Sequence, residues 1–108
     1  MSEFIDHLRD VLREFGPIEA RRMFGGYGVY HDGLMFGLIV DETLYLKADE
    51  DNAAHFHEHQ LPQFEYLRRG RPTRLSYYRA PDVVTEDSAE AARWARRSFE
   101  VALRGRRK

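Results

Sequence analysis

The feature that most constrains the fold is a series of three short segments whose composition is typical of β-strands, rich in Tyr, Phe, Val, Ile and Leu. Asp32-Gly33 separates the first two, and glycine tolerates the positive φ that a two-residue hairpin turn requires. Strands joined by such tight turns run antiparallel. The sequence therefore predicts an antiparallel meander, with strands at 21–31, 34–40 and 43–48.

The middle strand of this meander has apolar residues at both its odd and its even positions. This pattern indicates a central strand with both faces at least partly covered. Strict alternation would place Leu34, Phe36, Leu38 and Val40 on one side, with Met35 and Ile39 on the other. Further along the chain, strands are predicted at 64–68 and 74–79, joined by a turn at Gly70-Arg71-Pro72.

Three segments are predicted to be helical. Apolar residues recur at helical spacing over 2–15, with Ser2 as N-cap and Gly16-Pro17 as the end. A short helix at 49–59 is opened by the acids at positions 49–51, which favour a positive helix N-terminus. The last helix, 87–104, begins with a capping-box pattern and ends at Gly105. Its buried stripe is predicted to be Ala91, Ala92, Ala95, Phe99, Ala102 and Leu103, flanked by Trp94.

The element order is thus α-β-β-β-α-β-β-α, an α+β domain with a mainly antiparallel five-stranded sheet and three helices. A length of 108 residues suits one domain, 1–108. The chain has no cysteine, which excludes disulfides, thiol catalysis and thiolate metal sites. Its N-terminus has no basic cluster followed by an apolar run, and no stretch has the length to span a bilayer. We expect a cytoplasmic protein that does not enter membranes.

Charge is distributed unevenly along the chain. Residues 1–65 contain 13 acids and 5 bases, a net charge of −8, whereas residues 66–108 contain 5 acids and 12 bases, a net charge of +7. Such a split can mark an anion-binding half. It can equally reflect pairing between the two halves of one fold.

The glycines at 25, 26 and 28 lie where a phosphate-binding loop would not place them. Such a loop needs glycines between a strand and a helix N-terminus, whereas these lie inside a predicted strand that enters a hairpin. Glycine within a strand marks a bulge or a close backbone approach. The structural interpretation is therefore preferred.

The run His55-Phe56-His57-Glu58-His59 is the best metal candidate, because His55 and His59 would share one face of a helix. A site needs further ligands, and surface histidines near a helix end are commoner than ligands, so we predict no metal or other cofactor. No serine has an evident histidine partner, and the carboxylates are scattered. The sequence indicates no catalytic residues, and we read the chain as non-enzymatic.

The segment 64–79 interleaves arginines with aromatic residues. Guanidinium groups bind phosphates and rings stack on bases, so this composition suits a nucleic-acid surface. The alternative is that the rings face the core and the arginines pair with acids from the first half of the chain, and the pI of about 6.5 favours it. The candidate partner or nucleic-acid surface comprises Arg68, Arg69, Arg71, Arg74, Tyr77 and Arg79, extended by the bases at 104 and 106–108.

Several motifs together carry a resemblance that covers nearly the whole chain. They are the runs 21–30 (RRMFGGYGVY), 32–39 (DGLMFGLI), 44–50 (LYLKADE), 62–66 (PQFEY) and 75–78 (LSYY), followed by Trp94-Ala95. In this order they resemble the N-terminal domain of the TfoX/Sxy family of bacterial competence regulators. The Met-Phe-Gly-Gly-Tyr-Gly run is the most specific of them.

The resemblance implies a fold like that of type III secretion chaperones, and a role in transcription of competence genes together with another transcription factor. Full-length family regulators have a second, helical C-terminal domain, which has no counterpart in this sequence. We therefore expect a regulatory module that binds a protein partner. Direct nucleic-acid binding through the 68–79 hairpin is the alternative, and homodimerisation through sheet edges and the helix with Trp94 is a further expectation.

Overall fold

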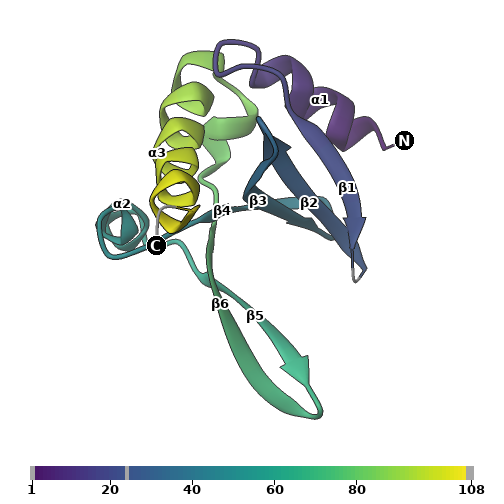
Figure 1. Ribbon diagram of the computed structural model, residues 1–108, viewed down its shortest axis with the longest axis vertical. Helices are drawn as coiled ribbons and strands as arrows, with labels where there is room; N and C mark the ends of the chain where they lie inside the picture. Colours follow the sequence, from purple (N-terminus) through teal and green to yellow (C-terminus); the bar gives the residue numbers. More distant parts are fainter. Residues whose placement is uncertain (1, 24, 107–108) are drawn as a thin grey trace.

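A computed structural model describes residues 2–23 and 25–106, and it has helices packed on one face of an antiparallel sheet (Figure 1). The sheet has six strands in the order β1-β2-β3-β4-β6-β5, and every pairing is antiparallel. The α+β class and the three helices are confirmed, whereas the predicted number of five strands is too low. The likeness to secretion chaperones stays a prediction. The strands are β1 (Glu19–Met23), β2 (Gly26–His31), β3 (Leu34–Val40), β4 (Thr43–Lys47), β5 (Gln63–Arg68) and β6 (Arg71–Arg79).

The sixth strand arises because the predicted strand 21–31 is two strands, β1 and β2. Gly25 has φ of +75° and forms part of the turn between them. The backbone approaches closely at Gly26, where a Cβ would lie 2.1 Å from the carbonyl oxygen of Ile39. Glycine at position 26 is thus required by packing, which agrees with the structural interpretation of this stretch.

The predicted hairpin turn at Asp32-Gly33 is confirmed, and a second hairpin turn, at Asp41-Glu42, joins β3 to β4. Asp32 and Gly33 both have positive φ, as do Asp41 and Glu42. β3 contains a bulge, however, because Val29 pairs with Gly37 while Tyr30 pairs with Met35. The extra residue, Phe36, therefore joins the face that carries Ile39, and the strict alternation predicted for this strand is wrong.

The helices are α1 (Glu3–Val11), α2 (Ala53–Glu58) and α3 (Ser88–Arg106), with a short 3₁₀ helix, η1 (Asp82–Thr85), before α3. The N-cap prediction for α1 is confirmed, since the Ser2 hydroxyl accepts a hydrogen bond from the Ile5 amide. Asp87 caps α3 in the same way, accepting from the amides of Ala89 and Glu90 at 2.9 and 3.0 Å. α1 ends before residue 15, and α3 continues through Gly105 rather than ending there.

α2 is shorter than predicted because the acidic run before it forms a turn of its own. The Asp49 side chain accepts from the Asp51 amide, and the buried Asn52 side chain bonds to the Asp49 amide and the Lys47 carbonyl. The helix begins only at Ala53 and has no acid in its first turn. The acids at 49–51 therefore do not act on the helix dipole as predicted.

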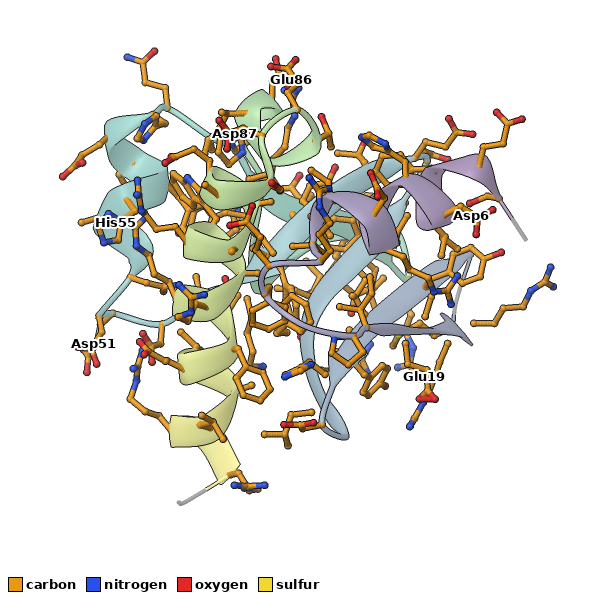
Figure 2. All side chains as sticks on the ribbon, turned by 90° about the horizontal axis from the view of Figure 1, so that it is seen from above. Asp6, Glu19, Asp51, His55, Glu86 and Asp87 are labelled. Atoms are coloured by element: carbon orange, nitrogen blue, oxygen red, sulfur yellow. The ribbon has the colours of Figure 1, made fainter. Side chains whose placement is uncertain are left out.

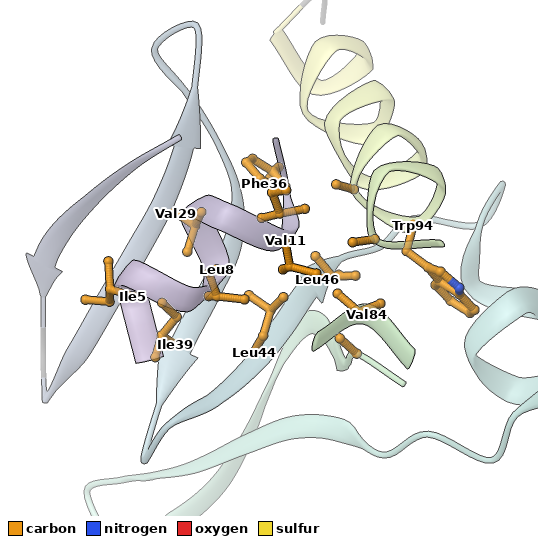
Figure 3. Close-up of a cluster of buried hydrophobic side chains, with 14 of the residues drawn as sticks. Ile5, Leu8, Val11, Val29, Phe36, Ile39, Leu44, Leu46, Val84 and Trp94 are labelled. Carbon is orange, nitrogen blue, oxygen red and sulfur yellow. The ribbon is translucent and has the colours of Figure 1, made fainter. Parts of the chain in front are cut away.

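The core lies between the sheet and the helices (Figure 3). Figure 3 shows Ile5, Leu8 and Val11 of α1 directed at Val29, Phe36 and Ile39 of the sheet, with Val84 and Trp94 closing the far side. Phe36 is fully buried, and its ring lies against Phe15 and Phe99 with centroids 5.1 and 6.3 Å away. On α3 the buried stripe also includes Ser98 and Val101, which the sequence-based stripe omitted.

Candidate functional site

The strand β6 divides the sheet into two regions. Its last residues, Tyr77–Arg79, pair with β4, and Ser76 bonds to the backbone of Ala48. Before Ser76, β6 pairs with β5 and, among the described residues, with no other strand. Residues 64–75, called here the basic arm, therefore project from the rest of the molecule as a two-stranded ribbon (Figure 1). The rest of the molecule is called the body.

The turn at the arm tip is one residue earlier than predicted. Arg69 and Gly70 occupy it, both with positive φ, of +53° and +78°. Arg71 and Pro72 lie in β6, so they belong to the ribbon and not to the turn. This register places Arg68 opposite Arg71 and Leu67 opposite Pro72.

The basic arm has four arginines and one glutamate, a net charge of +3. One of the four, Arg74, is paired within the arm, since its Nε donates to Glu65 at 3.1 Å. Within 2–23 and 25–106, no acidic side chain forms an ion pair with Arg68, Arg69 or Arg71, and all three are exposed. Three arginines of the predicted surface thus lie at the arm tip without an acidic partner among the described residues.

The other predicted members of this surface lie elsewhere and have local partners. Arg79 belongs to the body, where it binds Asp82 at 3.1 Å. Tyr77 is 8% exposed, its ring lies 5.1 Å from the Lys47 ammonium, and burial raises the pKa of its hydroxyl to about 12. Two of the five predicted arginines thus pair with acids. Arg74 pairs with Glu65 of the first half, as the alternative interpretation expects, whereas Arg79 pairs with Asp82 of the second half.

The expected extension of the surface to the chain's last bases is wrong at Arg104. Its guanidinium binds both carboxylate oxygens of Asp49 at 3.0 Å and also approaches Asp51 at 3.3 Å. These bonds hold the pKa of Asp49 below its ordinary value of 3.8. Arg104 thus fastens α3 to the turn before α2, and Arg107 and Lys108 lie outside the described residues.

The aromatic residues of the arm lie at its root, the end that joins the body. Phe64 contacts Tyr45 of β4 edge-on, with centroids 4.9 Å apart, and it stacks on Tyr66 at 6.1 Å. Beyond Tyr66 the apolar residues are Leu67 and Pro72, and Leu67 is 72% exposed. Sequence reasoning missed these two, although a leucine beside three arginines at a turn was a visible signal.

The sheet face opposite the core is a second candidate surface, called here the outer face. Strand register places Arg21, Leu38, Tyr45 and Arg79 on one side of the sheet, because paired residues share a face. No described helix packs on this side (Figure 1). Cations cover two of its rings: Arg21 lies 4.3 Å from the Tyr30 ring centroid, and Lys47 covers Tyr77.

The histidines of α2 have aromatic and backbone partners. His55 and His59 both pack edge-on against Trp94, with centroids 6.2 and 5.3 Å away. His57 lies 3.2 Å from the Tyr78 hydroxyl. In the part of the chain that the structure describes, no three His or acidic residues gather as metal ligands. Figure 2 shows Asp6 and Glu19 on the opposite side of the molecule from His55.

The same contacts bear on the expected dimer. Trp94 is 4% exposed and packs against Phe56, with ring centroids 5.3 Å apart. The Trp94 ring therefore offers no surface to a second copy, and dimerisation through the exposed side of its helix stays a prediction. Dimerisation through sheet edges stays a prediction.

Comparison with known proteins gives the family of this chain. The model of the TfoX N-terminal domain matches residues 10–102. The chain belongs to the TfoX N-terminal domain family. This TfoX domain is 30% identical over 96 residues to the protein Sxy of Escherichia coli, covering 89% of this chain and 46% of that protein.

A second relative is the DNA transformation protein TfoX1 of Aliivibrio fischeri. It is 24% identical over 89 residues, which cover 82% of this TfoX domain and 43% of the relative. The chain thus spans about half the length of the curated relatives it matches. The described helices include none that is long and apolar enough to cross a membrane.

Proposed function

We propose that this TfoX domain is a non-enzymatic, cytoplasmic regulatory module that acts through a protein partner in competence-type control of transcription. The observation that carries the proposal is the match of nearly the whole chain to Sxy and to a DNA transformation protein. The histidines and acids that could have served catalysis have structural partners or stand apart, as described above.

The outer face is the surface that we assign to the protein partner. It combines tyrosine rings with arginine and lysine side chains, and tyrosine and arginine are enriched in protein interfaces. Lys47 is the last residue of β4 and lies over the Tyr77 ring on this face. A charge reversal there changes the surface without removing a core side chain.

The test is a pull-down from the native lysate, with and without nuclease, using the wild-type chain, Lys47→Glu and Arg69→Glu/Arg71→Glu. Arg13→Glu is the matched control for the first variant, because Arg13 lies in the turn after α1 and its side chain is 59% accessible. Retention of a transcription factor or polymerase subunit after nuclease treatment, weakened by Lys47→Glu alone, is the expected result. Retention that no variant changes would contradict the assigned surface, and loss of all transcription proteins with nuclease would contradict the proposal.

A second function, direct nucleic-acid contact by the basic arm, is favoured by one specific observation. Arg68, Arg69 and Arg71 are exposed at the end of a projecting ribbon, and no described acid neutralises them. Arginines placed in this way bind phosphates and release counterions. If retention in the same pull-down disappears with nuclease and with the Arg69→Glu/Arg71→Glu variant, this second function replaces the first.

A further inference from the structure

The tip of the basic arm has two chemically different faces. Side chains alternate along a strand, so the cross-strand pair Arg68–Arg71 lies on one face and the pair Leu67–Pro72 on the other. Arg69 stands at the turn between them. A narrow ribbon thus presents an apolar pair flanked by three cations.

None of these features stabilises the arm itself. Like charges directly opposite one another on a ribbon are destabilising, and Leu67 leaves 72% of its surface in water. A two-stranded ribbon is also only marginally stable without further strands. A bound polyanion would neutralise the three arginines, and an apolar surface on it would cover Leu67 and Pro72.

Two observations favour duplex DNA as that polyanion. Proteins that bind single strands stack bases on open aromatic faces, whereas the arm's rings, Phe64 and Tyr66, lie at its root and stack on each other. Proteins that bind the minor groove combine arginines with an apolar wedge, commonly leucine or proline, inserted at a base step. The tip has both components and no aromatic ring.

We propose that the tip of the basic arm enters the minor groove of duplex DNA, where the Leu67–Pro72 pair acts as a wedge that kinks the duplex. Arg68, Arg69 and Arg71 contact the phosphates and the groove walls. This inference rests on the second function proposed above and adds to it the form of nucleic acid, the groove and the deformation. Flexible pyrimidine–purine steps are the sites where such a kink is easiest.

The experiment uses the whole chain and a 30-base-pair duplex with one central TA step, labelled at its ends for energy transfer. Binding is followed by anisotropy and bending by the change in end-to-end distance. We expect a bend within the range of about 20–90° that inserted wedges produce. We also expect affinity to fall about 40-fold for a roughly four-fold rise in salt, as about three phosphate contacts imply.

Four variants separate the wedge from the charge. Leu67→Ser should still bind, with about ten-fold lower affinity and no bend, whereas Leu67→Met should keep the bend because methionine also serves as a wedge. Arg69→Glu/Arg71→Glu should abolish binding. Arg13→Glu/Arg93→Glu has the same charge change at exposed positions and should bind and bend DNA nearly as the wild type does.

The outcomes distinguish the wedge from the function on which it rests. Salt-sensitive binding without a bend, or a bend that Leu67→Ser retains, overturns the wedge and leaves DNA contact standing. Tighter binding to the 30-base single strand than to the duplex overturns duplex recognition. Equal affinity for polyglutamate shows a general anion surface and overturns the assignment to DNA. Absence of binding to the duplex overturns both the wedge and the second function.

Discussion

The body and the basic arm share one sheet and one strand, yet they differ in what their side chains contact. In the body, Phe36 and Phe56 are 0% and 1% exposed, and neighbouring rings surround them. In the arm, the large apolar side chains of Tyr66, Leu67 and Leu75 are 36%, 72% and 37% exposed. The packing contacts that stabilise the domain therefore lie in the body, while the residues of the arm tip are suited to contacts outside it.

The partners of the arginines also differ between the body and the arm. In the body, Arg104 makes a two-bond pair with Asp49 and Arg79 pairs with Asp82. At the arm tip, Arg68 faces another arginine. Changes in the body should therefore alter folding, and changes at the tip should alter binding.

The largest effect is expected for Phe36→Ala. This substitution removes a fully buried ring between β3, α3 and the end of α1, and should lower the free energy of unfolding by about 3–5 kcal/mol. Urea denaturation measures it. The matched variant in the arm, Leu67→Ala, should change stability by less than about 0.5 kcal/mol. Comparable losses in the two variants would remove the distinction between body and arm.

Ser98→Ala should stabilise the body. The Ser98 hydroxyl is fully buried in α3 and has no hydrogen-bond partner among the described residues. Replacing it removes an unsatisfied polar group and introduces a better helix former, so the free energy of unfolding should rise by about 1–2 kcal/mol. Ser88→Ala is the control, because the Ser88 hydroxyl donates to Glu14 and should not stabilise when removed. A lower melting temperature for Ser98→Ala would argue for a hidden partner of that hydroxyl.

Asp49→Asn tests the pair that fastens α3 to the turn before α2. Because Arg104 lowers the pKa of Asp49 in the folded state, the pair's contribution is fully present above the ordinary value of 3.8 and is lost as the pH falls through the lower folded value. The pair is about one-third exposed, so we expect a loss of only about 0.5–1 kcal/mol at neutral pH.

Thermal melts of Asp49→Asn and the wild type should therefore differ at neutral pH and converge below about pH 4. Asp10→Asn is the control, since Asp10 and its partner Arg13 are 72% and 59% exposed and their oxygen–nitrogen distance is 3.5 Å. A difference that persists unchanged at acid pH would mean that the charge of Asp49 is not the cause.

The smallest effect on global stability is expected for Arg69→Asn. Asparagine tolerates the left-handed conformation that Arg69 adopts, so the turn should gain about 1 kcal/mol or less. Because the arm can open without the body, hydrogen exchange of the arm amides should slow while the global unfolding transition stays in place. DNA affinity should fall with the lost charge. A shift of the global transition would show that the arm and body unfold as one unit.

The sequence was a good guide where structure depends on neighbouring residues. Asp32-Gly33 predicted its turn because positive φ is a local requirement, and Ser2 and Asp87 marked helix starts because a capping bond spans three residues. The turn at Gly25 was missed because neighbouring glycines suit a bulge and a turn equally. The bulge at Phe36 was missed because periodicity assumes that every residue of a strand is paired.

For the candidate site, the sequence predicted the kinds of residue that take part but not how they are arranged. Arg68, Arg69 and Arg71 were correctly placed in one hairpin, but the pairing of Arg104 with Asp49 depends on segments that the fold brings together. Nor does the sequence show that β6 extends beyond β4, since that follows from the register of β6 against β4 and β5. The exposure of Leu67 could be recognised only once this projection was seen.

The continuity of β6 also sets a distance. Gly70 at the tip lies six residues before Ser76, where the strand joins the body, a span of about 20 Å at the usual rise per residue. A molecule bound at the tip therefore lies away from the outer face, and the outer face stays accessible to a second macromolecule. The domain has the geometry of a spacer, able to join two partners without either one blocking the other.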